Sequence, residues 1–98
     1  MAGDPTVVAP HVYSVVEEND RVRVLRYRAG PGEVTELHSH PDHVAITTSA
    51  GKYRFTTADG DSMEVELEAG EALFLEAGGH RTENIGDSEA TGFIVELK

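Results

Sequence analysis

The stretch KYRFTTADGDSMEVELE, residues 52–68, carries the clearest structural signal in the chain. Tyr53, Phe55 and Thr57 alternate with polar neighbours, and the same alternation returns after Asp59-Gly60. Because successive side chains of a strand point to opposite faces, this pattern predicts two strands, each with one buried and one solvated face. The Asp-Gly pair between them is typical of a tight hairpin turn.

The rest of the chain continues this organisation. Short runs of Val, Ile, Phe, Tyr and Thr are separated by turn-forming residues, and no segment has the spacing of an amphipathic helix. We expect about eight or nine strands, which a double-sheet jelly roll would pack with protected edges. The sequence therefore predicts an all-β fold, a single-domain jelly-roll β-barrel over residues 11–98, preceded by a flexible N-terminal arm over residues 1–10.

Composition excludes several classes of function. The 98 residues carry a formal net charge of -10, and no cluster of Lys and Arg could neutralise a nucleic-acid backbone. The chain has no cysteine, so any metal must be held by nitrogen or oxygen atoms. The N-terminus lacks the features of a signal peptide, and no apolar run approaches membrane-spanning length. We therefore expect a cytoplasmic protein that binds neither nucleic acid nor membranes.

Three of the five histidines lie in HSHPDH, residues 38–43. In a strand, His38 and His40 would point to the same side with Cα atoms roughly 6.6 Å apart, within joint reach of one metal ion. That spacing is a weak signal by itself, because polar alternation on a solvated strand face produces it too. Wider spacing patterns are needed to decide between a metal site and a solvated strand face.

Two longer stretches supply such patterns: GEVTELHSHPDHVAITTSAG, residues 32–51, and GEALFLEAGGHRTEN, residues 70–84. Their glycine and histidine spacings resemble the first and second signatures of the cupin family, the second being one residue short between glycine and histidine. The resemblance implies a small β-barrel that holds one divalent metal ion, with His38, His40 and His80 at the histidine positions of the family.

The chain departs from the cupin pattern at two positions. Val44 stands where the family has a metal-binding glutamate, and Glu76 stands where it usually has proline. Valine cannot bind a metal, so the site either uses three histidines or recruits a replacement, for which His43 is the candidate. In a regular strand His43 would face away from the interior, and only a hairpin or bulge at Pro41-Asp42 would turn it inward.

The donor type leaves the metal open, because imidazole nitrogen binds Fe, Ni, Zn and other divalent ions, with Mn a further option. Three neutral ligands would leave the charge of the ion uncompensated and favour an anionic substrate. The resemblance extends to cupins with three-histidine iron sites, which implies an Fe(II) dioxygenase acting on a small thiol or diketone. The alternatives are a non-redox isomerase or lyase and a non-catalytic small-ligand-binding protein. A homodimer is expected, because small cupins commonly pair.

Further residues are candidates for supporting roles. Glu36 and Asn84 are placed to hold imidazole rings through hydrogen bonds. His11 lies outside both signatures and is expected on the surface, whereas Phe55 and Phe74 are expected in the core. Four side chains would meet a substrate carboxylate if they faced inward: Arg26, Arg28, Tyr53 and Arg54.

Overall fold

A computed structural model describes residues 3–98 and contains nine strands and one short helix in that part of the chain. The helix is α1 (Pro5–Val8), and no helix among these residues is long and apolar enough to cross a membrane. The strands are β1 (Tyr13–Glu18), β2 (Val22–Ala29), β3 (His38–His40), β4 (His43–Thr47), β5 (Gly51–Thr57), β6 (Ser62–Leu67), β7 (Ala72–Leu75), β8 (Gly78–Asn84) and β9 (Ala90–Leu97).

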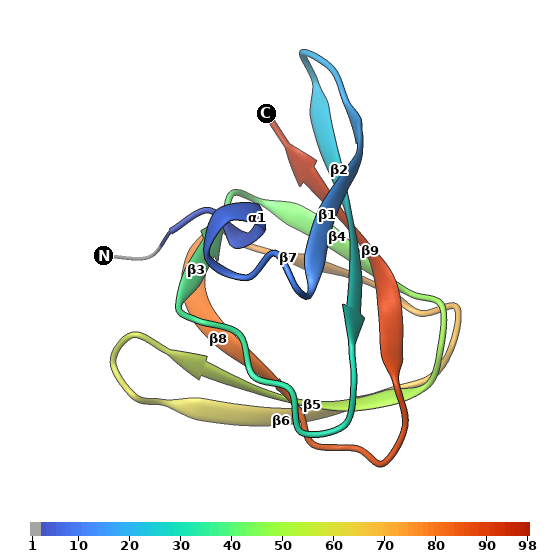
Figure 1. The fold of residues 1–98 in the computed structure, drawn as a ribbon. Coiled ribbons are helices and arrows are strands. Elements are labelled where there is room, and N and C mark those ends of the chain that lie inside the picture. The colour runs from blue at the N-terminus through green and yellow to red at the C-terminus, as the bar shows by residue number, and fades with distance from the viewer. Residues whose placement is uncertain (1–2) are drawn as a thin grey trace.

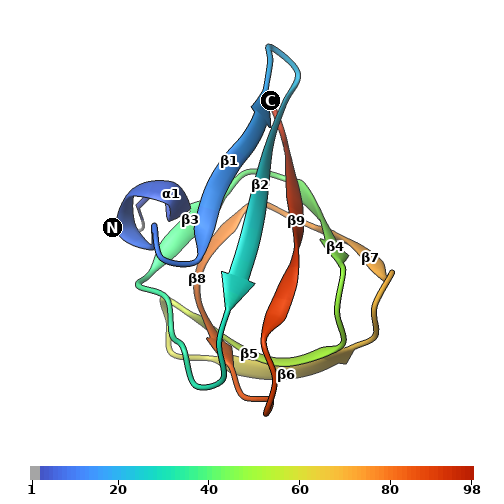
Figure 2. The same ribbon diagram turned by 45° about the vertical axis from the view of Figure 1, so that its right-hand side comes forward.

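The strands form two sheets that face each other (Figures 1 and 2). The larger sheet has the order β1-β2-β9-β4-β7 and the smaller one has the order β3-β8-β5-β6, with every strand pair antiparallel. Hydrogen bonding does not close the two sheets into one ring, so the barrel is a pair of open sheets. The predicted all-β jelly-roll fold is confirmed.

The hairpin expected over residues 52–68 consists of β5 and β6. Tyr53 pairs with Val65 and Phe55 pairs with Met63, so the alternating apolar side chains share the inner face of the smaller sheet. Gly60 has a φ of 91°, a conformation that side-chain-bearing residues rarely adopt, which explains the glycine in the turn.

Strand β9 is the central strand of the larger sheet and organises its inner face. Its residues alternate between buried and half-buried from Ala90 to Glu96. Gly92 lies opposite Tyr27 of β2, and any side chain at Gly92 would collide with the Tyr27 hydroxyl. The glycine therefore makes room for a tyrosine on the inner face.

The N-terminal segment packs on the barrel, where the sequence predicted a loosely held arm. Asp4 caps α1 by accepting a hydrogen bond of 2.9 Å from the Thr6 N–H, and Pro5 and Ala9 are buried. Gly3 forms an isolated bridge with His38, and Figure 1 shows α1 beside β3. The capping residue and the small buried side chains hold α1 against the barrel. The flexibility predicted for residues 1–10 stays a prediction, and residues 1 and 2 lie outside the described part.

Candidate metal centre

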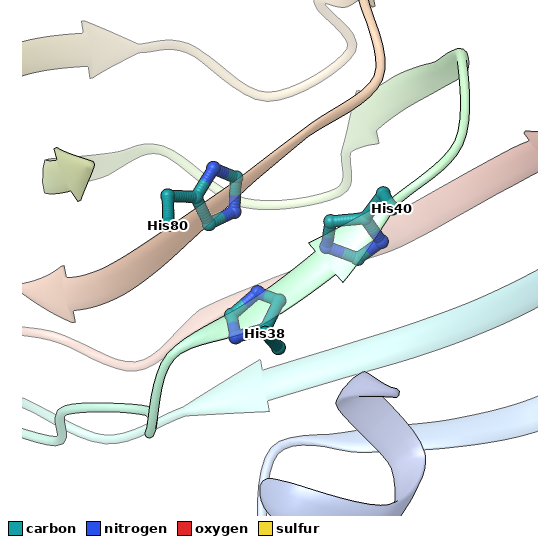
Figure 3. A group of neighbouring side chains, drawn as sticks. All are labelled: His38, His40 and His80. Atoms are coloured by element: carbon teal, nitrogen blue, oxygen red, sulfur yellow. The ribbon is translucent and has the colours of Figure 1, made fainter. Parts of the chain in front are cut away.

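Three histidines converge between the sheets. His38 and His40 lie on β3, and His80 lies directly opposite His38 on the neighbouring strand β8. One ring nitrogen from each histidine lies within 4.8 Å of the others, and Figure 3 shows the three rings turned toward one another. His38 and His40 are buried and His80 is half-buried. The spacing of HSH on one strand and the pairing of β3 with β8 together create this cluster, which we call the histidine cluster.

Hydrogen bonds fix the orientation of the imidazole rings. Nδ1 of His38 lies 2.9 Å from the carbonyl oxygen of Glu36, and Nδ1 of His40 lies 2.7 Å from the carboxylate of Glu96. Both partners accept hydrogen bonds, so Nδ1 carries a proton in each ring. The predicted role of Glu36 is thus performed by its backbone carbonyl, whereas Asn84 binds the carbonyls of Ala29 and Ser88 instead of a histidine.

Burial keeps two of the rings neutral. It lowers the pKa of His38 to about 4 and the pKa of His80 to about 3, and the neighbouring imidazoles add to both shifts. At pH 7 these histidines are therefore unprotonated, which is the state that binds a metal ion. A group of close, neutral nitrogen donors is suited to a divalent cation.

His43 also faces the interior and is only 3% exposed, with its ring centre 4.7 Å from that of His40. The expectation for a regular strand, an outward His43, is wrong because the chain passes from the smaller to the larger sheet at Pro41-Asp42. The Asp42 side chain holds this corner by accepting a hydrogen bond of 2.8 Å from the Ala77 N–H. After the corner His43 lines the interior cavity and Val44 does not. His43 lies beside the histidine cluster but is not one of the three residues whose ring nitrogens lie within 4.8 Å of one another.

Glu96 is a site residue that the sequence analysis missed. Glu96 is 3% exposed, and its carboxylate accepts the hydrogen bond from His40 and another of 2.8 Å from Nε of Arg23. Burial alone would raise the pKa of Glu96, but these bonds and the Arg23 charge hold the pKa below its usual value. The sequence did contain a sign of it: an ionisable residue two positions after Ile94, and so on the same face of the last strand.

Tyr13 is the second residue that was missed. Its hydroxyl lies 3.3 Å from Nε2 of His38, and its ring meets the rings of His38 and His40 edge to face. Burial raises the pKa of Tyr13 to about 12, so the phenol stays protonated and donates its hydrogen bond to His38. Tyr13 stands at the start of β1, far in sequence from both histidine stretches, and nothing local marked it.

A cavity of about 340 Å³ adjoins the histidine cluster. His40, His43 and His80 are in its lining at one end of β8, and Tyr53, Asn84 and Tyr27 are in its lining at the other, since Tyr53 pairs with Asn84 and bonds to Tyr27. Phe55, expected in the core, lines this cavity with its ring centre 5.3 Å from that of His80. Phe74, also expected in the core, is 59% exposed because its neighbours Leu73 and Leu75 line the cavity and strand alternation points Phe74 to the outer face. His11 is exposed, as predicted.

The three arginines considered as substrate contacts lie outside the cavity. Arg28 pairs with Glu89, and Arg54 pairs with Glu64 and Glu83 on the outer side of the smaller sheet. Arg26 lies over the ring of Phe93 at 5.7 Å. Only Tyr53 of the four candidates lines the cavity, and its hydroxyl is bonded to that of Tyr27 at 3.0 Å.

Comparison with known families agrees with this architecture. The model of the cupin domain matches residues 25–96, which is most of the chain. The chain belongs to the cupin family. The predicted membership of the cupin family is thereby confirmed.

Solved structures of other cupins share the fold. A cupin domain from Bordetella pertussis Tohama I is 29% identical, with a TM-score of 0.81 over 89% of this chain and 92% of that chain. A double-stranded β-helix protein from Klebsiella pneumoniae is 24% identical, with a TM-score of 0.70 over 88% of this chain and 75% of that chain. An RmlC-like cupin from Methanocaldococcus jannaschii is 17% identical, with a TM-score of 0.68 over 88% of this chain and 78% of that chain. No curated protein matches this cupin.

Proposed function

We propose that this cupin binds one divalent metal ion through His38, His40 and His80. The observation that carries the proposal is the convergence of three ring nitrogens within 4.8 Å of one another in a buried position. The neutral rings of His38 and His80 support it, and so do the hydrogen bonds that fix the rings of His38 and His40. His43 is the candidate for an additional ligand or a contact to a bound molecule. Donor type allows Fe, Ni, Zn or Mn.

The residues around the cluster have distinct tasks in this proposal. Glu96 holds the His40 ring and places a negative charge behind it, which makes His40 a stronger donor. The Tyr13 hydroxyl occupies the lone pair of His38 Nε2. It must leave that nitrogen when a metal binds, and it is then free to donate to a molecule held at the metal.

We further propose that the reaction is oxygenation of a small anionic substrate of the thiol or diketone class. Bound Fe(II) would supply the oxygen activation, and three neutral ligands would leave its positive charge to attract the anion. The non-redox alternatives, an isomerase or lyase and a non-catalytic binding protein, use the same cluster. They differ from the dioxygenase in consuming no oxygen.

The test begins with elemental analysis of protein purified without a histidine tag. We expect one divalent ion per chain, and oxygen uptake when Fe(II)-loaded protein meets diketones or thiols. The exposed His11 provides a matched control: His11→Ala should keep the metal, whereas His38→Ala should lose it. If the protein takes up no divalent metal in calorimetric titration, the metal proposal is wrong. Metal binding without oxygen uptake would leave the non-redox alternatives.

The homodimer and the cytoplasmic location expected from the sequence stay predictions. For the dimer, the exposed Val15 and Val16 on the edge strand β1 offer an apolar surface for pairing. Light scattering of the purified protein measures the mass directly. A mass of one chain at micromolar concentration would contradict the dimer.

A further inference from the structure

The ionisable groups of the cavity are unevenly distributed. His40, His43 and His80 gather at the end next to the cluster, and Glu76 is an exposed residue of the lining. The tyrosines of the lining are uncharged at neutral pH, because burial raises their pKa values. Charge recognition is therefore confined to the histidine end.

Residues 3–98 include all eight Lys and Arg side chains of the chain, and none of the eight lines the cavity. Arg23 is held by Glu96 and Asp4 beside the cluster. Arg28 and Arg54 are paired with carboxylates away from the cavity. A second negative charge on a bound molecule would have no cation to meet it.

The polar groups at the far end are already bonded to one another. The hydroxyls of Tyr27 and Tyr53 bond to each other, and the Asn84 amide binds two backbone carbonyls. Among the described residues, the buried side-chain atom without a hydrogen-bond partner is Oγ1 of Thr82, which lines the cavity on the same strand as His80. The far end offers a ligand few unsatisfied polar groups.

The cavity walls are aromatic and aliphatic. The rings of Tyr53 and Phe55 stack with centres 5.9 Å apart, and Val65, Leu67 and Ile94 continue the apolar lining. A void of ~150 Å³ holds a benzene molecule. A cavity of about 340 Å³ therefore has room for a ring together with a small head group.

We infer that this cavity takes a small molecule with one anionic head and an uncharged, apolar or aromatic body. The head lies at the histidine end and the body lies against Phe55 and the aliphatic wall. The role of the head rests on the proposed metal site, whereas the choice of body rests on the cavity alone. Among the substrate classes considered, diketones with apolar substituents agree with this arrangement. Amino-acid thiols do not, since their carboxylate would find no Lys or Arg side chain in the cavity lining.

Three hydroxamates with the same head test the inference on wild-type protein loaded with Co(II). Acetohydroxamate carries only a methyl body, benzohydroxamate adds the phenyl ring, and 4-carboxybenzohydroxamate adds a second charge to that ring. We expect benzohydroxamate to bind about tenfold tighter than acetohydroxamate, because the ring buries apolar surface. We expect the distal carboxylate to weaken binding about tenfold or more. The change in the Co(II) absorption spectrum reports each affinity.

Two results separate this inference from the metal proposal. If acetohydroxamate binds but neither the phenyl ring nor the carboxylate changes the affinity, the inference is wrong and the metal site stands. The same series is titrated into metal-free protein and followed by the aromatic NMR signals of Phe55 and Tyr53. A preference there for the phenyl over the carboxyphenyl compound would support the inference even if the metal proposal failed. Equal or absent binding of both compounds in both forms would overturn it.

The two phenylalanines supply a matched pair of variants. Phe55→Ala removes a wall of the cavity and should reduce the advantage of benzohydroxamate over acetohydroxamate about fivefold to tenfold. Phe74→Ala changes an exposed residue outside the cavity and should leave the ratio unchanged. Circular dichroism confirms folding of both variants. Equal ratios in wild type and Phe55→Ala would contradict the placement of the body.

Discussion

The two ends of the cavity differ in how their polar side chains are hydrogen-bonded. At one end, the ring nitrogens of His38, His40 and His80 approach one another without hydrogen-bonding among themselves. At the other end, the hydroxyls of Tyr27 and Tyr53 bond directly to each other. The distance between the ends along β8, from His80 to Asn84, is roughly 13 Å for four residues of extended chain.

This difference suggests separate roles: the histidine end is suited to binding a metal ion, and the tyrosine end stabilises the fold. Buried polar groups usually satisfy each other, and the tyrosine end follows that rule. The histidine end bonds Nδ1 of His38 and His40 and leaves ring nitrogens of the cluster close together without hydrogen bonds among them, an arrangement that a bound cation would stabilise. We therefore expect changes at the histidine end to alter metal binding and changes at the tyrosine end to alter stability alone.

The largest expected effect is that of His80→Ala on metal affinity. Removal of one of three ligands should weaken Zn(II) binding at least about a thousandfold, or about 4 kcal/mol. Competition titration against a chelator measures the change. Tyr53→Phe, at the other end of the cavity, serves as the control and should leave the affinity unchanged. Retention of wild-type affinity in His80→Ala would remove His80 from the site.

The next effect is a pH dependence of stability in the metal-free protein. The pKa of His38 falls from 6.5 in the unfolded chain to about 4, and that of His80 falls from 6.5 to about 3. Between those values the unfolded state binds more protons, so stability is full above about pH 6.5 and decreases as the pH is lowered toward 4. Urea unfolding at pH 7 and pH 5 should show a loss of up to a few kcal/mol.

His80→Ala sharpens this prediction, because the variant lacks one of the three histidines whose pKa values burial lowers. Its stability should fall less between pH 7 and pH 5 than that of the wild type. An identical pH dependence in both proteins would show that His80 does not contribute to the effect.

Glu96→Gln should have a smaller effect on metal binding. The amide keeps the size of the side chain but loses the negative charge behind His40, and loss of such a partner typically costs about 10-fold to 100-fold in metal affinity. Glu64→Gln, which breaks an exposed pair with Arg54, is the control and should change nothing. If Glu96→Asp keeps the wild-type metal affinity, the negative charge matters more than the length of the side chain. Equal affinity in Glu96→Gln and wild type would show that Glu96 acts only in folding.

The smallest expected effect belongs to the tyrosine end. Tyr53→Phe leaves the hydroxyl of Tyr27 without its partner and should lower the free energy of unfolding by about 1 kcal/mol. Urea unfolding at pH 7 measures it. A change in metal affinity in this variant would contradict the separation of the two ends.

Local pattern was sufficient to predict the strands and much of the cluster. Alternation in residues 52–68 predicted the hairpin, and the spacing of His38 and His40 placed both rings on one side of a strand. The pairing of His80 with them required a resemblance, because the sequence separates them by forty-odd positions and spacing alone cannot align two strands.

The alternation of side chains along a strand could not predict the orientation of His43. This alternation holds only within one regular strand, and the chain passes from one sheet to the other at Pro41-Asp42, between His40 and His43. Glu96 escaped notice for a related reason. Its contact with His40 spans 56 positions and exists only because β9 packs across from β3 inside the barrel.

The sequence by itself determined the all-β architecture, the hairpin turn and the supply of histidines, because alternation and turn chemistry are local properties of the chain. The tertiary structure alone decided that His43 faces inward, that Glu96 and Tyr13 adjoin the cluster and that the arginines stay outside the cavity. Those outcomes depend on which strands become neighbours and where the chain crosses between sheets, and both follow from the packing of the whole domain.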